Sequence, residues 1–120
     1  MKGPYLLNDE NVDALSSSPG VYIIGYRRDE KDYGTYVGRS DDDLKGRLRQ
    51  HLPRNETNRC IKSLKCDRFS YEYAKTARAA YERECTIYHQ YSHNGKPGYV
   101  CNDVHPAKSN NAWKCPKCGA

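Results

Sequence analysis

The sequence predicts an α+β fold in which a small three-stranded antiparallel sheet is flanked by helices and followed by a cysteine-bearing tail. Two patterns of hydrophobic residues support this class. Residues 21–28 and 69–73 are rich in aromatic and β-branched side chains, which is typical of strands. Residues 44–52 and 77–91 repeat apolar side chains at helical spacing. The predicted order along the chain is therefore strand, strand, helix, strand, helix.

The composition indicates a folded domain with few aliphatic side chains. The chain has 120 residues, a net charge of +5, and eleven Tyr against one Phe and one Trp, so tyrosine rings must supply much of the core. No apolar stretch is long enough to span a bilayer and no secretory signal opens the chain, which predicts a cytoplasmic protein without a membrane-spanning segment. In a reducing compartment, six cysteines indicate metal or redox chemistry rather than disulfides.

The first predicted elements form a hairpin. Residues 9–18 can make one or two helical turns before a Pro-Gly pair. Residues 21–28 form the first strand and residues 35–38 begin the second, so the polar residues 29–34 are expected to be the turn between them.

The first long helix follows directly. Ser40 is predicted to be its N-cap, because residues 41–43 are all Asp and negative charge is favoured in a first helical turn. Leucines at every fourth position of residues 44–52 mark the buried face, and the helix stops before Pro53.

The second half contains one strand and one longer helix. Residues 53–67 form a basic loop with a helical turn near 61–64, and residues 69–73 alternate aromatic and polar side chains as a half-buried strand does. Thr76 is the predicted N-cap of a helix that continues to about Tyr91.

Positive charge is concentrated between residues 45 and 68. Lys and Arg that neutralise phosphates supply most of the non-specific affinity for nucleic acid, so this stretch predicts a nucleic-acid partner, and a merely solvated face is the alternative. The basic residues are Lys45, Arg47, Arg49, Arg54, Arg59, Lys62, Lys65 and Arg68.

Two charged residues stand on helix faces that should pack inward. Arg47 borders the leucine stripe, with His51 one turn further, and its planar guanidinium suits a phosphodiester. The alternative is that Arg47 extends past the leucines and His51 is a partly buried core histidine. Glu84 lies on the inward face of the second helix, whereas Glu82 points more to solvent. An inward carboxylate is usually paired or bound to a cation, so Arg47 or a divalent metal ion is the expected partner of Glu84.

These residues occur in an order that resembles the GIY-YIG nuclease superfamily. Gly20-Val21-Tyr22 and Tyr36-Val37-Gly38 are similar to its paired signature motifs. The spacing to an arginine and a histidine on the first helix, the run Ala-Tyr-Glu-Arg-Glu at 80–84 and a later asparagine also resemble the family. The resemblance covers about residues 19–105, and residues 41–43 make the approach to the arginine one residue longer than usual.

The resemblance implies a metal-dependent endonuclease that hydrolyses phosphodiester bonds in DNA. One tyrosine would take a proton from the attacking water, the arginine would stabilise the transition state, and the glutamate would hold one Mg²⁺ or Mn²⁺. Glu82 competes with Glu84 for this role, and Asn94 competes with Asn102. The residues implied as catalytic are Tyr22, Tyr36, Arg47, Glu84 and Asn102. Those expected to contact the substrate are Arg39, Ser40, His51, Arg49 and Arg54.

The tail carries a separate metal signal. Cys115-Pro-Lys-Cys118-Gly is similar to one half of a zinc site, which needs two further ligands. Cys85 and His89, four residues apart on the second helix, would complete a structural Cys₃His site. The alternatives are the pair Cys60 and Cys66, with Cys101 and His105 as outside candidates.

Three functions stay open at this point. The domain at residues 1–105 with its zinc-held tail at 106–120 can be a nuclease, a non-catalytic nucleic-acid-binding module of the same fold, or a zinc-stabilised protein-interaction domain. DNA is the expected partner of the first two, and a homodimer or a targeting protein can help to select the site of cutting.

Overall fold

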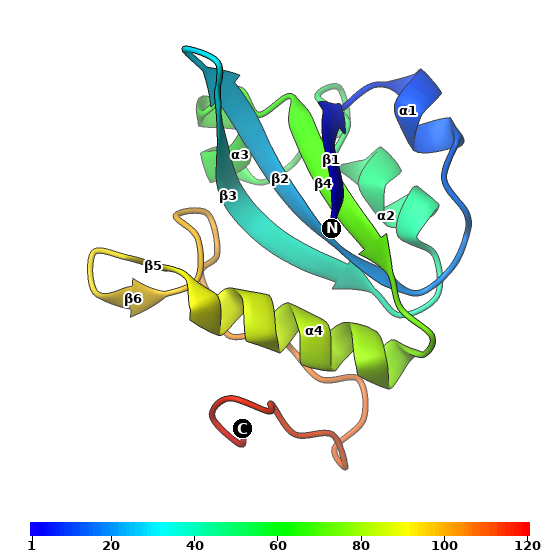
Figure 1. Cartoon of the computed structure of the whole chain (residues 1–120), viewed down its shortest axis with the longest axis vertical. Coiled ribbons are helices and arrows are strands. Elements are labelled where there is room, and N and C mark those ends of the chain that lie inside the picture. Colours follow the sequence, from blue (N-terminus) through cyan, green and yellow to red (C-terminus); the bar gives the residue numbers. More distant parts are fainter.

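A four-stranded antiparallel sheet in the order β1-β4-β2-β3 is the centre of the computed structural model, which describes residues 1–120 (Figure 1). Its strands are β1 (Lys2–Leu6), β2 (Gly20–Arg28), β3 (Lys31–Ser40) and β4 (Arg68–Tyr73). The helices are α1 (Asp9–Asp13), α2 (Leu44–Gln50), α3 (Arg59–Ser63) and α4 (Ala77–Gln90). A short hairpin, β5 (Ser92–His93) and β6 (Lys96–Pro97), follows α4. The predicted α+β class with an antiparallel sheet is confirmed, and the sheet has one strand more than expected.

The additional strand is β1, which pairs with β4 at the edge of the sheet. All five of its residues are exposed, so they show none of the apolar alternation by which strands are recognised. Pro4 would also argue against a central strand, but an edge strand tolerates it.

The hairpin between β2 and β3 is tighter than predicted. Only Asp29 and Glu30 form the turn, and their φ angles of 52° and 65° are those of a two-residue hairpin turn. The polar residues 31–34 belong to β3 and lie on the exposed part of the hairpin, which explains why composition alone suggested a longer loop.

The predicted N-cap of α2 is wrong by three residues, whereas that of α4 is confirmed. Asp43 caps α2 by accepting a hydrogen bond from the Gly46 N–H at 2.9 Å. Ser40 ends β3, and its hydroxyl accepts from the Asp43 N–H at 2.8 Å, which closes the turn into the helix. Thr76 caps α4 through the Ala79 N–H at 3.0 Å.

Helices cover both faces of the sheet. Figure 1 shows α4 on one face of the sheet and the other helices on the opposite side. The side chains of β2 alternate, so Tyr22 and Ile24 pack against the leucines of α2 and against α1 and α3, whereas Val21 packs against α4. No helix of the chain is both long enough and apolar enough to cross a membrane. This layering puts the motif-bearing ends of β2 and β3 between α2 and α4.

Two connections hold the C-terminal part of the chain. Cys60 of α3 and Cys101 form a disulfide, with their Cα atoms 5.4 Å apart, which corrects the expectation of unpaired cysteines. The two are 41 residues apart in sequence, and no local pattern marks them as partners. Further on, Cys115 is buried against Tyr81 and Cys85 of α4, where the C-terminal segment lies along the helix (Figure 1).

Candidate active site

Five segments of the chain meet at one cavity of about 510 Å³ beside β3. They are β2, β3, α2, α4 and the segment that follows β6. Each supplies one of the side chains singled out in the sequence, namely Tyr22, Tyr36, Arg47, Glu84 and Asn102. Acidic, basic and phenolic groups therefore converge from positions up to 80 residues apart.

Tyr22 is almost fully buried at the inner end of this cavity. Its hydroxyl makes a 2.8 Å hydrogen bond with Nε2 of His51, and burial raises its pKa well above the ordinary value. Gly38 on the neighbouring strand leaves room for the phenol, because a Cβ atom at that position would lie 2.4 Å from the Tyr22 hydroxyl oxygen. Tyr36 is half-buried, with its ring centre 6.4 Å from that of Tyr22, and burial raises its pKa as well.

The close approach of Gly38 and Tyr22 leads to a stability prediction. Gly38→Ala should lower the free energy of unfolding by about 1–3 kcal/mol, because the added methyl group must push the buried ring aside. Urea denaturation measures the loss. In a Tyr22→Phe background, which removes the nearest atom, the same substitution should be less destabilising, and an equal loss in both backgrounds would contradict this packing.

Arg47 lies at the opening of the cavity on α2. Its side chain is exposed, and its guanidinium makes no hydrogen bond or ion pair within the protein. An unpaired guanidinium at the opening is available to an anion from solution.

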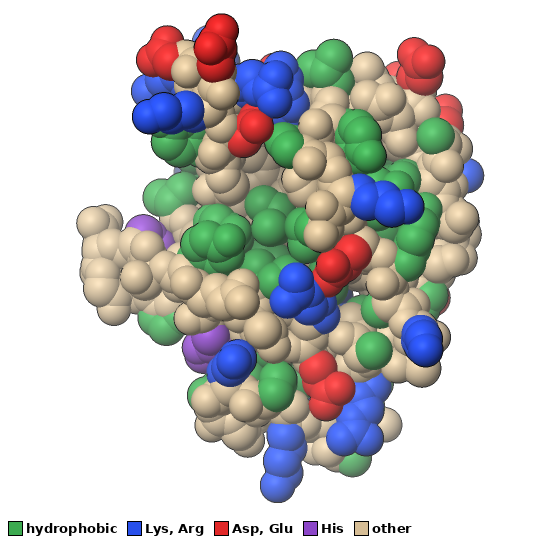
Figure 2. All heavy atoms as spheres, viewed as in Figure 1, with side chains coloured by type: hydrophobic (Ala, Val, Ile, Leu, Met, Phe, Trp, Pro, Cys, Tyr) green, Lys and Arg blue, Asp and Glu red, His purple; other side chains and the backbone are tan.

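The other basic residues of the same stretch are placed differently. Arg49 pairs with Asp13 at 2.8 Å and Arg54 with Asp9 at 2.7 Å, both on the surface between α2 and α1 and outside the cavity. On the face of the molecule drawn in Figure 2, Lys and Arg side chains are dispersed among acidic ones and form no continuous basic patch.

Glu84 is the carboxylate that α4 presents to the cavity. It is 8% exposed, and its Oε1 accepts a hydrogen bond from Nη1 of Arg39 at 2.7 Å. Its protein partner is thus Arg39 and not Arg47, which the sequence suggested. Arg39 also donates from Nε to Oδ1 of Asp41 at 2.8 Å, so one guanidinium bridges two carboxylates. Burial raises the pKa of Glu84, and the hydrogen bond from Arg39 opposes that shift. Glu82, by contrast, is exposed and lies near Arg78, with a nitrogen–oxygen distance of 3.6 Å.

The donor set at Glu84 fits a small divalent cation. Oε2 of Glu84 has no hydrogen-bond partner within the protein, and Asp41 also lines the cavity. Mg²⁺ in proteins is usually held by one or two carboxylates, with water and substrate phosphate completing its shell. A cation at Oε2 would lie beside the Arg39 guanidinium, which is hydrogen-bonded to Oε1 of the same carboxylate.

Asn102 completes the site from the far side of β3. Its amide accepts from the Val37 N–H at 3.1 Å and donates to the Val37 carbonyl at 3.0 Å, which satisfies the free edge of the strand. It thereby fixes the backbone between the tyrosine and the glycine of the second motif. Asn94 lies elsewhere, at φ 49° in the exposed turn between β5 and β6.

Of the five residues expected to contact a substrate, only one lines the cavity. Arg39 lines the cavity, while His51 lies behind Tyr22 and Ser40 is buried in the turn before α2. The sequence did not predict two further residues, namely Asp41, which lines the cavity, and Glu56, which is hydrogen-bonded to His51. The only signals for them were the acidic run at 41–43 and the isolated acid within a basic stretch.

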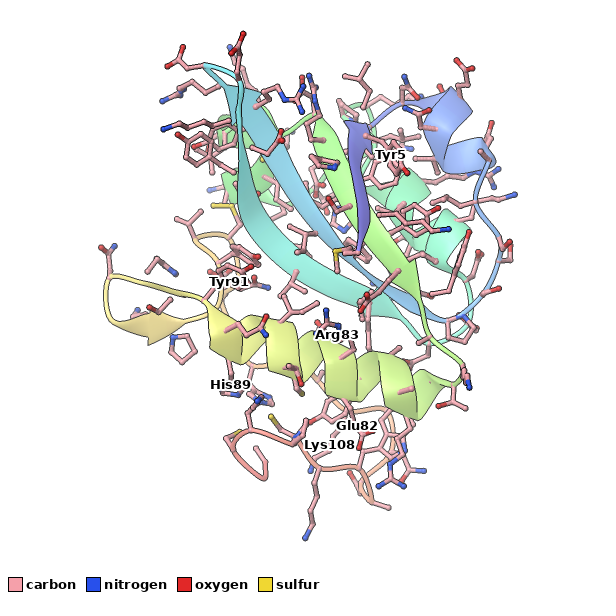
Figure 3. The ribbon with its side chains drawn as sticks, viewed as in Figure 1. Tyr5, Glu82, Arg83, His89, Tyr91 and Lys108 are labelled. Atoms are coloured by element: carbon pink, nitrogen blue, oxygen red, sulfur yellow. A yellow bond between two sulfur atoms is a disulfide. The ribbon has the colours of Figure 1, made fainter.

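A second cluster contains His105, which also lines the cavity. One ligand atom from each of four side chains lies within 4.8 Å of the others, and the four are His89, His105, Cys115 and Cys118. His89 is on the side of α4 that faces the C-terminal segment (Figure 3), and its Nε2 is buried without a hydrogen-bond partner. A buried polar atom without a partner is uncommon, and a bound metal ion would satisfy it.

The cysteines of this cluster form a tight turn suited to a metal. The Gly119 N–H donates to the Cys115 carbonyl at 2.9 Å, and the Lys117 N–H donates to the Cys115 sulfur at 3.4 Å. Burial opposes ionisation of Cys115, but hydrogen bonds from the Cys118 and Lys117 N–H groups and from His105 lower its pKa to about 6. Thiolate is the form of cysteine that binds metals, so this cluster can hold a metal ion.

The cluster differs by one ligand from the set expected from the sequence. His105 takes the place of Cys85, which is buried beside Cys115 and Tyr81 and whose pKa burial raises to about 12. The alternative zinc ligands from the sequence, Cys60 and Cys66, are not part of this cluster. Cys60 is in the disulfide, and the Cys66 sulfur lies 3.2 Å from the Thr35 hydroxyl.

Comparison with known proteins agrees with the geometry of the cavity. A family model described as the GIY-YIG catalytic domain matches residues 18–97, two thirds of the chain. Searches of curated proteins and of solved structures return no match. The matched region contains both tyrosine motifs, Arg47 and Glu84, and it ends before Asn102 and the cysteines of the tail. The family is one of nuclease-type domains that generally use a divalent metal. The chain therefore belongs to the GIY-YIG family.

Proposed function

We propose that this protein is a metal-dependent endonuclease that hydrolyses phosphodiester bonds in DNA. The observation that carries the proposal is the convergence of Tyr22, Arg47 and Glu84 on one cavity from three different elements. Phosphodiester hydrolysis needs a proton acceptor for water, a cationic donor for the developing charge and a carboxylate for a metal ion, and these side chains supply one of each.

The groups have distinct parts in the proposed reaction. Glu84, with Asp41 beside it, would hold Mg²⁺ or Mn²⁺, which when bound supplies positive charge at the phosphate. Arg47 donates hydrogen bonds to the non-bridging phosphate oxygens as negative charge builds on them. Tyr22 is the favoured proton acceptor of the two tyrosines, because its hydroxyl is hydrogen-bonded to a histidine that can take up a proton. Asn102 keeps the edge of β3 in place.

We further propose that the cluster of His89, His105, Cys115 and Cys118 holds a structural Zn²⁺. Two imidazoles and two thiolates are a common tetrahedral zinc set, and four protein ligands leave no open position for chemistry. The unpartnered Nε2 of His89 supports this assignment. The ion would join a tail at 106–120 to a domain at 1–105, and we propose this division of the chain.

Cleavage of supercoiled plasmid tests the proposed activity. We expect nicking in Mg²⁺ or Mn²⁺ that EDTA abolishes, and a loss of about 10²–10³-fold in rate for Arg47→Ala. Arg49→Ala is the matched control, since Arg49 lies on the same helix but pairs with Asp13 outside the cavity, and its rate should stay within about twofold.

The alternative functions predict other results. A non-catalytic module would retain plasmid in a salt-sensitive manner without cutting it, and a protein-interaction domain would do neither. Linear product formed in a single encounter would favour a homodimer, because each chain has one such cavity and two strands must be cut.

A further inference from the structure

A buried chain of hydrogen bonds runs from the proposed proton acceptor away from the cavity. The Tyr22 hydroxyl is hydrogen-bonded to Nε2 of His51 at 2.8 Å, and Nδ1 of His51 is hydrogen-bonded to Oε2 of Glu56 at 2.6 Å. The side chains of His51 and Glu56 are only 12% and 5% exposed. The chain therefore links a phenol, an imidazole and a carboxylate, and solvent has little access to it.

Glu56 is held in place independently of His51. Its other oxygen, Oε1, accepts the backbone N–H groups of Thr57 at 3.1 Å and Asn58 at 2.9 Å, in the turn before α3. No Lys or Arg forms an ion pair with this carboxylate, so His51 is the one side chain hydrogen-bonded to it. Both oxygens of a nearly inaccessible carboxylate are thus used, one to anchor it and one to contact the imidazole.

The identity of the groups decides which nitrogen of His51 carries the proton. An ionised carboxylate can only accept, so the neutral imidazole must donate from Nδ1 to Glu56. Nε2 is then an acceptor, and the Tyr22 hydroxyl must donate to it. With the opposite tautomer, Nε2–H would donate to the phenol oxygen and could not take its proton.

We infer that Glu56 is a positioning residue, which fixes His51 in the tautomer that accepts the proton of Tyr22. The inference rests on the proposed nuclease function. As the water oxygen bonds to phosphorus and the bond from phosphorus to the leaving sugar oxygen breaks, the water proton passes to the Tyr22 oxygen, and the proton of Tyr22 passes to Nε2 of His51. The leaving alkoxide takes its proton from solvent water. The imidazolium formed lies against the Glu56 carboxylate, which stabilises it, and Glu56 itself takes up no proton.

Glu56→Gln separates this role from a merely structural one. The amide oxygen can still accept the two backbone N–H groups, so the turn before α3 is retained. Its NH₂ group donates to Nδ1 of His51 and thereby moves the imidazole proton to Nε2. We expect kcat for plasmid nicking to fall by about 10²-fold or more while KM changes by less than about threefold. Glu10→Gln, at an exposed position of α1, is the matched control and should retain the wild-type rate.

The tautomer of His51 can be measured without any activity. Long-range ¹H–¹⁵N spectra, with the signals assigned by a His51→Ala variant, should show the proton on Nδ1 in the wild type and on Nε2 in Glu56→Gln. A wild-type imidazole protonated on Nε2, or a Glu56→Gln variant that cuts at the wild-type rate, would overturn the inference. Absence of cutting by the wild type would instead refute the nuclease proposal, and the spectra would still decide whether Glu56 sets the tautomer.

Discussion

Replacing Glu84 with glutamine should lower the rate of Mg²⁺-dependent DNA cleavage by about 10³-fold or more. Glutamine has the same shape, but it lacks the charge that holds a divalent ion, and loss of metal assistance removes several kcal/mol of transition-state stabilisation. Glu84 is 8% exposed and lines the cavity, so no other carboxylate of α4 can replace it. Plasmid nicking under single-turnover conditions measures the effect.

Glu82→Gln is the matched control for this experiment. The two residues are on one helix, but the side chain of Glu82 is 41% exposed and lies near Arg78. Its replacement should leave the rate within about twofold, because exposed ion pairs contribute little. If Glu84→Gln cut DNA normally and Glu82→Gln did not, the assignment of the metal-holding carboxylate would be wrong.

The pairing of Glu84 with Arg39 has a consequence for metal affinity. A divalent ion at Oε2 of Glu84 would lie beside a guanidinium that already bridges two carboxylates, and the two positive charges would repel each other. Binding of the ion is then coupled to a movement of Arg39, and a phosphate in the cavity offers the released guanidinium a new anionic partner. Metal and nucleic acid would therefore favour each other's binding at this site.

The placement of Glu84 could be predicted from the sequence because it follows from local geometry. A helix turns by about 100° per residue, so the apolar positions of α4 determine which acid faces inward. For Arg47 the leucines of α2 misled, because its side chain is exposed at the cavity and does not pack inward as the sequence predicted. Strand β1 offered no such pattern, since all its residues are exposed and it is ordered only by pairing with β4.

The remaining features depend on contacts between distant segments. Glu56 contacts His51 only because the chain turns back after α2, and the disulfide of Cys60 with Cys101 joins residues 41 positions apart. The fourth member of the His/Cys cluster, which we propose to hold zinc, is a further case. Helical spacing favoured Cys85 as the partner of His89, whereas the segment after β6 brings in His105 from outside the helix.

Removing the metal from the tail should destabilise the protein by several kcal/mol. Folding and metal binding are coupled in structural zinc sites, and here the ligands come from α4, the cavity wall and the C-terminal turn. A loss of about 3 kcal/mol corresponds to a fall in Tm of about 10 °C for a domain of this size. Thermal unfolding with and without a strong zinc chelator measures the difference.

His105→Ala and Cys85→Ala distinguish the two ligand sets. Zinc released by denaturation and counted with a chromogenic chelator should be about one equivalent for the wild type and for Cys85→Ala, and much less for His105→Ala. Cys85→Ala should still lower Tm, because it leaves a small void beside Tyr81, but without loss of metal. Retention of zinc by His105→Ala and its loss from Cys85→Ala would favour the Cys₃His set instead.

His105→Ala should also affect the candidate active site. His105 belongs to the His/Cys cluster and also lines the cavity, and further along this segment Ser109 donates a hydrogen bond to Asp41, beside Arg39 and Glu84. Loss of the ion would free the segment that carries His105 and Ser109. The hydrogen bond from Ser109 that helps to hold Asp41 beside Glu84 would then be weakened. His105→Ala should therefore lower cleavage as well as stability, whereas Cys85→Ala, assayed well below its Tm, should cut at nearly the wild-type rate. A structural metal ion that does not contact the phosphate would in this way control the geometry around the catalytic ion.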